Sequence, residues 1–323
     1  MPEHLAPVRE YRLDGIEPDN LLGFLALLGL LRALEEAEPS WRPRVRWTGM
    51  PLRPHLSLTQ NVNRQTLLEA VAHGCQILAE SHDFDRADVV FTMTDARDIL
   101  KQESRSAQPK KRHRADLFSA LMSDGAIKED KDAVKVTPYC TIFGQGHQHF
   151  LERLVTVPNG ILPKKLAKKP NANLNSPEKL EQALFHPWNR TDPTQSFRWD
   201  PLEDRRYALR FDDPSGDDAL TVHGANRLAS LALALLTAVP IRQRGKIQLA
   251  AVGTGSDESS RLCVWWPVWS RPATLEAIVS MLSASGGHPE ALIDRPGLGV
   301  LRVYRSRRIS FGKFMNFTRA TAS

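Results

Sequence analysis

The chain of 323 residues carries 43 Lys and Arg against 37 Asp and Glu, a formal charge of +6, and is 41% hydrophobic. This composition is typical of an ordinary globular protein and excludes a collagen-like or wholly disordered chain. Its length corresponds to one large domain or two smaller ones at roughly 100–200 residues each, and such a core needs no disulfides or metals.

The cysteines and the apolar segments indicate where in the cell the protein is expected. The three cysteines, Cys75, Cys140 and Cys263, form no CxxC pair, which excludes a disulfide scaffold and a local zinc knuckle and fits a reducing cytosol. The N-terminus lacks a basic segment followed by an apolar core. The most apolar stretch runs only from Leu21 to Leu34, whereas a membrane span needs about 20 residues. We therefore expect a cytoplasmic protein with no membrane contact.

The first part of the chain begins with an alternating segment, 8–13, that predicts a strand. Possible capping residues at 18–20 then precede a buried central helix that ends near Glu36, in which Gly23 and Gly29 permit close approach of neighbouring elements. The sequence next predicts extended pieces at 44–47 and 55–58 and a helix at 64–80.

The middle of the chain is more polar. Residues 101–114, with few apolar side chains and a proline, predict an exposed basic loop. After it we expect a helix from Ala115 that stops before Gly125, an extended segment at 135–143, a helix at 147–155 and a second basic loop at 158–175. Loops of this kind often carry binding function.

The last third mixes helices and strands. The patterns predict, in chain order, a helix at 224–239, a strand at 247–252, a hairpin loop at 253–256, a strand at 262–266, a helix at 273–281 and an extended basic tail from Gly299. We therefore predict an α+β fold, with mixed helices and short strands around a central apolar helix and with basic surface loops. The expected parts are an N-terminal α+β region (1–157, with the basic loop 101–114), a basic linker or loop (158–176) and a C-terminal α+β region with the basic tail (177–323).

Motifs for catalysis are weak. No GxxxxGK[ST] occurs, so an ATP motor has no sequence support. His82 and Asp83 match the HD pair of metal-dependent phosphohydrolases, but His73 alone does not complete such a site. A metal nuclease would need converging carboxylates, and the candidates are Asp192, Asp200, Glu203 and Asp204. Because Arg198, Arg205 and Arg206 lie among them, internal ion pairs are favoured over a metal site.

The segment Gly144, Gln145, Gly146 and His147 allows two interpretations. If a helix begins here, its free backbone amides form a place for a phosphate. Alternatively, the segment is only a helix start, with one of His147 and His149 packed and the other exposed. The sequence leaves both open.

Three basic clusters point to nucleic acid as the leading partner class. Clustered Lys and Arg give salt-sensitive affinity for phosphates without sequence recognition. In the third cluster, Phe311, Phe314 and Phe317 interleave with the charges, as a base-stacking surface would; packing of these rings in the core is the alternative. The clusters consist of Lys110, Lys111, Arg112 and Arg114; of Lys164, Lys165, Lys168 and Lys169; and of Arg302, Arg305, Arg307, Arg308 and Lys313.

Four stretches resemble subunits of type I-G (formerly I-U) CRISPR systems. They are residues 13–29 (LDGIEPDNLLGFLALLG), 143–151 (FGQGHQHFL), 192–200 (DPTQSFRWD) and 223–229 (HGANRLA). The resemblance implies a DNA-binding and RNA-binding surveillance complex in antiviral defence, in the position of the large subunit or of an accessory protein to the helicase-nuclease. It further implies guide RNA, a double-stranded DNA target with its PAM duplex, and other effector subunits as partners.

Two classes of function compete with the leading hypothesis. The leading hypothesis is a non-catalytic nucleic-acid-binding subunit with no cofactor and no metal. The first alternative is a metal-dependent nuclease that uses His82, Asp83 and His147 or the carboxylates of 192–204. The second is a protein–protein adaptor without nucleic-acid contact.

Overall fold

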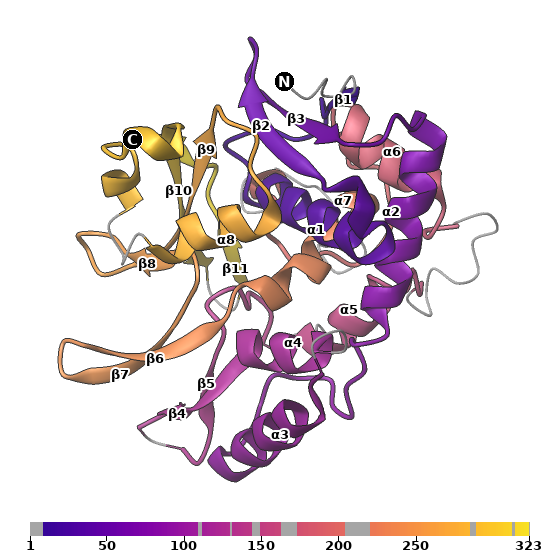
Figure 1. Ribbon diagram of the computed structural model, residues 1–323. Helices are drawn as coiled ribbons and strands as arrows, with labels where there is room; N and C mark the ends of the chain where they lie inside the picture. The colour runs from indigo at the N-terminus through magenta and orange to yellow at the C-terminus, as the bar shows by residue number, and fades with distance from the viewer. Residues whose placement is uncertain are drawn as a thin grey trace, which may run out of the picture.

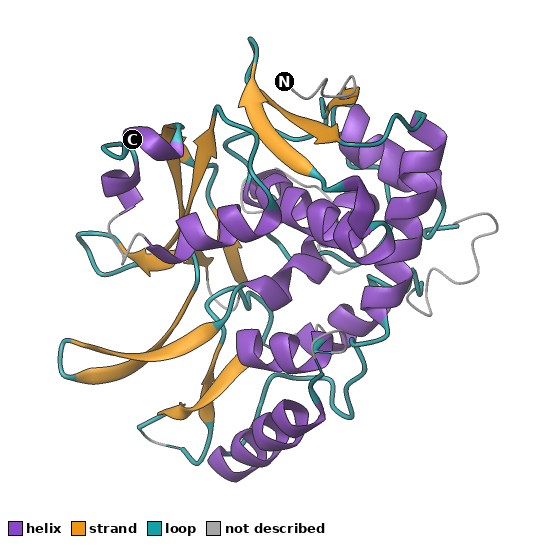
Figure 2. Ribbon diagram, in the orientation of Figure 1, coloured by secondary structure: helices purple, strands orange, loops and turns teal. Residues whose placement is uncertain are grey.

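The computed structural model describes residues 9–108, 112–129, 131–143, 149–162, 173–203, 220–284, 289–311 and 314–322. Helices and strands are interleaved along the chain, and the strands form several small sheets (Figures 1 and 2). The predicted α+β fold is confirmed. No helix within these ranges is long and apolar enough to cross a membrane.

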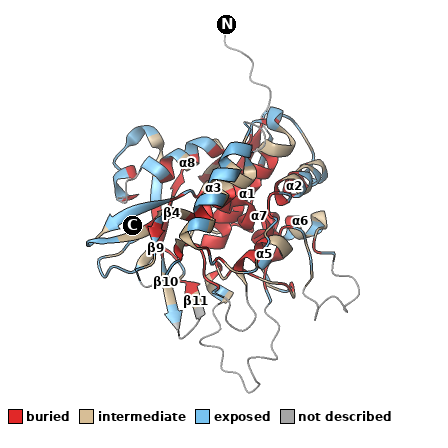
Figure 3. Ribbon diagram, turned by 90° about the horizontal axis from the view of Figure 1, so that it is seen from below, coloured by how far each residue is buried: buried red, intermediate tan, exposed pale blue. Residues whose placement is uncertain are grey.

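The central element is helix α1 (Leu21–Ala37), whose residues 21–34 are all buried. It begins at Asn20, whose side chain accepts a hydrogen bond from the backbone N–H of Gly23 and so satisfies one of the free amides at the helix start. Because leucines occupy every side of this helix, it can only be stable inside the protein. Figure 3 shows α1 and α7 as the buried centre of the molecule, which confirms the predicted central apolar helix.

Two helices pack against α1 at very short range. Helix α7 (His223–Ala232) is buried throughout, and a Cβ on Gly29 would lie only 1.9 Å from the carbonyl oxygen of Leu228. Helix α2 (Arg64–Ala79) meets α1 on another side, where Gly74 touches the backbone of Ala33. Glycine at these contacts lets the helix backbones approach closely, as the sequence predicted for Gly29.

Two sheets flank these helices. The first contains β1 (Arg9–Arg12), β3 (Arg53–Leu58) and β2 (Arg44–Thr48), in the order β1-β3-β2. The second contains β8 (Thr254–Ser256), β9 (Leu262–Trp269), β10 (Val300–Phe311), β11 (Phe314–Phe317) and β12 (Thr321–Ala322), with β9 and β10 paired in its middle. Phe24 of α1 stacks on Trp266 of β9 at 5.5 Å between ring centroids, so N-terminal and C-terminal parts of the chain share one core.

Two two-stranded ribbons complete the fold. One consists of β4 (Met122–Ile127) and β5 (Val134–Val136), and the other of β6 (Ala238–Gln243) and β7 (Lys246–Ala251). Both extend away from the body of the protein, with β4 next to β6 (Figure 1). The remaining α-helices are α3 (Met93–Ser106), α4 (His113–Leu121), α5 (Phe150–Thr156), α6 (Pro177–Phe185) and α8 (Leu275–Ala284).

Several predicted elements differ in the structure. Residues 101–106 are not a loop but the end of α3, which a capping box of Thr92 and Asp95 initiates. Because only Ala96 of this helix is fully buried, its polar composition gave little helical signal. The sequence also predicted a helix from Ala115, whereas α4 starts two residues earlier, at His113.

Three further boundaries were wrong. The helix predicted over 224–239 is an α-helix only to Ala232 and a short 3-10 helix over Leu233–Leu235, and residues 238 and 239 already belong to β6. One apolar run therefore covers both helix and strand. Of the predicted hairpin loop 253–256, residues 254–256 instead form the strand β8, paired with β9, whereas Gly253 lies in a turn. Of the extended segment 135–143, only its start belongs to a strand, β5.

Candidate nucleic-acid interface

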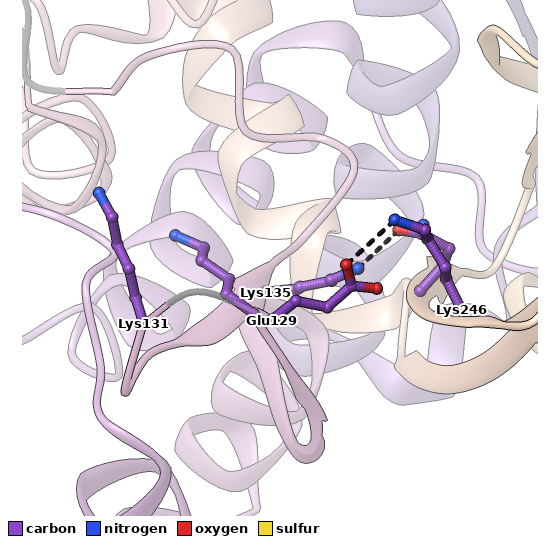
Figure 4. A pocket seen from close by; sticks show the side chains of 6 residues that line it. Glu129, Lys131, Lys135 and Lys246 are labelled. Atoms are coloured by element: carbon purple, nitrogen blue, oxygen red, sulfur yellow. Dashed lines mark hydrogen bonds and ion pairs between the residues drawn. The ribbon is translucent and has the colours of Figure 1, made fainter.

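A basic hollow of about 360 Å³ lies between the two projecting ribbons. Four lysines line it: Lys128, Lys131, Lys135 and Lys246, together with Glu129 and Gln248. We call it the lysine cleft. The β4–β5 ribbon supplies the first three lysines and the β6–β7 ribbon supplies the fourth, so the cleft forms only when the two ribbons fold side by side (Figure 4).

Contacts within the cleft hold its two walls together. Lys246 forms an ion pair with Glu129, with 3.0 Å between Nζ and Oε2, and joins the ends of the two ribbons. Lys135 donates hydrogen bonds to the backbone carbonyl of Ile247 and to Oε1 of Gln248, the latter at 3.0 Å. Since both members of the Lys246–Glu129 pair are more than half exposed, this pair contributes at most about 1 kcal/mol to stability.

Two of the four lysines are available for a ligand. Lys131 is exposed and Lys128 is half-buried, and neither makes an ion pair with another residue that the structure describes. The residues that line the cleft include four lysines and one carboxylate, Glu129, so its lining carries an excess of positive charge. A concave surface with one sign of charge attracts phosphate groups.

The lysine cleft is not apparent from the sequence. Lys128, Lys131 and Lys135 alternate with Glu129, Asp130 and Asp132, so the segment has no net charge along the sequence. Lys246 lies more than a hundred residues further along the chain and joins the others only through the pairing of the ribbons. The sequence contained one usable signal, the Arg244–Gly245 turn between two alternating segments.

The structure divides the predicted arginines of β10 between two faces of the sheet. Neighbouring side chains of a strand point to opposite faces, so Arg305 and Arg307 share one face and Arg302 and Arg308 the other. Arg305 is paired with Glu290, and Arg307 lies 3.6 Å from Asp257. Most of this cluster is therefore engaged within the protein.

Arg308 and Phe317 also make contacts within the protein. Arg308 donates to the carbonyl of Pro138 at 3.3 Å, and burial lowers its pKa. Phe317 is completely buried, so it is not available for base stacking, and the core interpretation holds for this ring. The exposed Arg302 makes no ion pair with the residues that the structure describes.

The first basic cluster is only partly described. Arg112 is paired with Asp116 at 2.8 Å, and Arg114 is paired with Glu103 at 2.7 Å and lies over the ring of Phe118. The other predicted site residues lie outside the described residues; these are Lys110, Lys111, Gly144, Gln145, Gly146, His147, Lys164, Lys165, Lys168, Lys169 and Lys313.

The structure also places the residues of the nuclease hypothesis. His82 is buried, its Nδ1 lies 2.9 Å from the carbonyl oxygen of Leu154, and burial lowers its pKa to about 3. Asp83, by contrast, is exposed. Within the described ranges, no group of three or more His, Cys, Asp and Glu side chains is arranged to hold a metal ion.

The carboxylates of 192–203 take part in internal contacts, whereas Asp204 lies outside the described residues. Asp192 pairs with Lys179 and accepts from the backbone N–H of His223 at 2.8 Å. Asp200 is completely buried and pairs with Arg190 at 2.7 Å.

Glu203 lies close to this group. It accepts a hydrogen bond from Thr221, and burial together with the charge of Asp200 raises its pKa to about 7. These contacts link loops to the core.

The four stretches that carry the resemblance meet at one place in the core. Asn20, from the first stretch, donates to Asp200, from the third, at 3.1 Å. Phe150 of the second packs edge-on against Phe197 of the third at 5.7 Å between centroids, and Asn226 of the fourth accepts from the Phe197 backbone. Their described residues therefore form a structural unit around α1 rather than an exposed site.

Neither a scan against protein-family models nor a search of curated protein sequences finds a match to this chain. The features of this chain that bear on its function are therefore the four resembling stretches and the lysine cleft.

Proposed function

We propose that this chain is a non-catalytic nucleic-acid-binding subunit of a type I CRISPR surveillance complex. The observation that carries nucleic-acid binding is the lysine cleft, which four lysines from two separate ribbons line together with one carboxylate. The resemblance of the four core stretches supports the place in the complex. In that place the chain contacts target DNA, guide RNA or both and helps to recruit the helicase-nuclease.

The lysine cleft suits a phosphate backbone better than a small anion. It is open to solvent, and its ammonium groups come from the ends of two ribbons rather than from a closed pocket. Lysine binds phosphate as a point charge and imposes little geometry. A cleft whose cationic lining residues are all lysines therefore favours binding that positions a strand without selecting its sequence.

The test compares the salt dependence of binding in two variants of the full chain. The cleft variant is Lys128→Ala with Lys131→Ala, and the control is Lys101→Ala with Arg105→Ala, which removes two exposed positive charges from α3. We expect the slope of log affinity against log salt to flatten by roughly 0.7–0.9 per lost phosphate contact in the cleft variant only. Fluorescence anisotropy with labelled DNA and RNA measures it.

Three results contradict the proposal. Equal slopes for the cleft variant and the native chain would remove the cleft as the binding surface. No salt-dependent binding to any DNA or RNA would favour the adaptor hypothesis. Cleavage that requires a divalent cation and is lost in Asp83→Ala would favour the nuclease hypothesis.

A further inference from the structure

The β6–β7 hairpin has an unusual shape for an element of a globular domain. Its strands are joined by the two residues Arg244 and Gly245, with φ angles of 51° and 78°, and positive φ at both positions is the geometry that closes a tight hairpin. Six residue pairs give it a length of about 20 Å at roughly 3.4 Å per residue. No third strand pairs with it in the described chain, so it is a two-stranded ribbon, with β4 of the neighbouring ribbon alongside β6.

The far end of this ribbon is cationic. Arg242, Arg244 and Lys246 are all exposed around the turn. Lys246 is paired with Glu129, but Arg242 and Arg244 make no ion pair with any residue that the structure describes. They differ in this from Arg305 and Arg307 of β10, which have carboxylate partners inside the protein.

The base of the ribbon exposes apolar side chains. Val239 and Ile241 are 49% and 39% exposed, and alternation along the strand places them on one face. Their cross-strand partners are Ala250 and Gln248, so this face also includes an amide that lines the lysine cleft. By the same alternation Arg242 lies on the other face, so the hairpin carries arginine on one face and at its turn, and amide and branched apolar groups on the other. The edges of base pairs present partners for both kinds of group: acceptors on guanine and the methyl group of thymine.

The width of the major groove determines which nucleic acid the hairpin can enter. The major groove of B-form DNA, about 12 Å wide, admits a two-stranded ribbon, whereas the major groove of A-form RNA is too narrow for side chains to enter. We propose that the β6–β7 hairpin enters the major groove of double-stranded DNA, with Arg242 and Arg244 against base edges. This inference rests on the proposed function, because the lysine cleft would hold the adjoining phosphates.

Lys246 links the phosphate contact in the lysine cleft to the base-edge contact of the hairpin. It belongs both to the hairpin end and to the lysine cleft, and its ion pair with Glu129 fixes the hairpin against the β4–β5 ribbon. A phosphate held in the cleft is therefore next to a groove that the hairpin can enter. Phosphate contacts set the position of the protein on the duplex, and base-edge contacts add selectivity.

The experiment uses the full chain with Arg242→Ala and Arg244→Ala together. The control combines Arg44→Ala and Arg295→Ala, which removes two exposed arginines from other elements. Anisotropy is measured with one sequence as duplex DNA, duplex RNA and single-stranded DNA, each about two helical turns long. We expect native binding to favour duplex DNA and the hairpin variant to bind it about tenfold more weakly or worse, with the control unchanged.

A modified duplex tests the groove itself. Replacing guanine by 7-deazaguanine removes the N7 acceptor, which faces only the major groove. We expect this change to weaken binding of the native chain and to leave the hairpin variant unaffected. Native affinity that is equal for both duplexes would overturn the proposal.

The outcomes separate this inference from the proposed function. If the hairpin variant loses affinity for single-stranded and duplex DNA equally, the hairpin binds phosphates and the groove proposal is wrong. The proposal of nucleic-acid binding then still stands. The groove proposal is also wrong if the hairpin variant binds duplex DNA as well as the control does. If the native chain binds none of the three probes, both proposals fail. Circular dichroism of both variants checks that the fold is intact.

Discussion

Charged side chains are paired beside α1 and partly unpaired in the lysine cleft. In the core, Asp200 is fully buried and accepts hydrogen bonds from Arg190, Asn20 and the backbone N–H of Leu202. In the cleft, Lys131 is exposed and has no ion pair with the described residues around it. A buried charge must be paired, because leaving it unpaired costs several kcal/mol, whereas an exposed one stays hydrated at little cost.

This difference shows why a run of charges in the sequence is a poor guide to a binding site. The arginines of β10 are close in sequence, yet Arg305 and Arg307 have carboxylate partners within the chain. The lysines of the cleft alternate with acidic residues in the sequence but line one hollow in space.

The largest effect is expected for Gly29→Ala, where α1 and α7 touch. The added Cβ would lie 1.9 Å from the carbonyl oxygen of Leu228, a backbone atom that moves only if the two helices separate. We expect the free energy of unfolding, measured by urea denaturation, to fall by more than about 3 kcal/mol. The control is Gly297→Ala, since nothing lies within 4 Å of the Cβ there. An equal, small change in both variants would mean that the helix contact is not tight.

A smaller loss is expected for Asp200→Asn. The amide keeps the size of the carboxylate, but its NH₂ group faces donors, since Arg190 and Asn20 both donate to Asp200. We expect unfolding to become easier by about 2–3 kcal/mol, the penalty for buried groups left without a partner. Asp85→Asn, at a carboxylate that is 80% exposed, should change stability by under about 0.5 kcal/mol.

Asp200 also distinguishes structure from catalysis. If Asp200→Asn leaves stability unchanged, the interpretation of this carboxylate as a structural ion pair is wrong. If it instead removes a divalent-dependent cleavage activity, the nuclease alternative gains support. A thermal melt and a cleavage assay on the same preparation separate the two.

Much of the core could be predicted from the sequence, and the ribbons could not. The apolar run that forms α1 and the periodic apolar positions of α2 are local signals, so their predicted starts, Leu21 and Arg64, match the structure. The lysine cleft depends on pairing between β4–β5 and β6–β7, which no local pattern encodes. The helix predicted to run to Val239 concealed the hairpin, because its first strand continues an apolar segment.

Stability should also depend on pH through two buried histidines. Burial lowers the pKa of His82 and of His223 to about 3, far below the usual 6.5. The folded state therefore binds fewer protons than the unfolded state below pH 6.5. The stabilisation is complete above that pH and is lost as the pH falls toward 3, by about 1.4 kcal/mol per pH unit for each histidine.

Glu203 acts in the opposite direction. Its pKa is raised to about 7 by burial and by Asp200, so its contribution is complete below about pH 4.5 and is lost as the pH rises through 7. We expect Glu203→Gln to make the decline of stability between pH 6.5 and 4.5 steeper, and His223→Gln to make it shallower. Urea titrations at several pH values measure both.

The smallest effect concerns the arginines of β10 and bears directly on the comparison of paired with unpaired charges. Arg305 and Arg307 are already neutralised by Glu290 and Asp257, so a phosphate would have to displace a carboxylate to bind them. We expect Arg305→Ala with Arg307→Ala to flatten the salt dependence of nucleic-acid binding by clearly less than the roughly 0.7–0.9 per contact expected for the cleft lysines. Because these ion pairs lie at the surface, stability should change by under about 1 kcal/mol. A slope change equal to that of the Lys128 and Lys131 variant would mean that internal pairing does not remove an arginine from the binding surface.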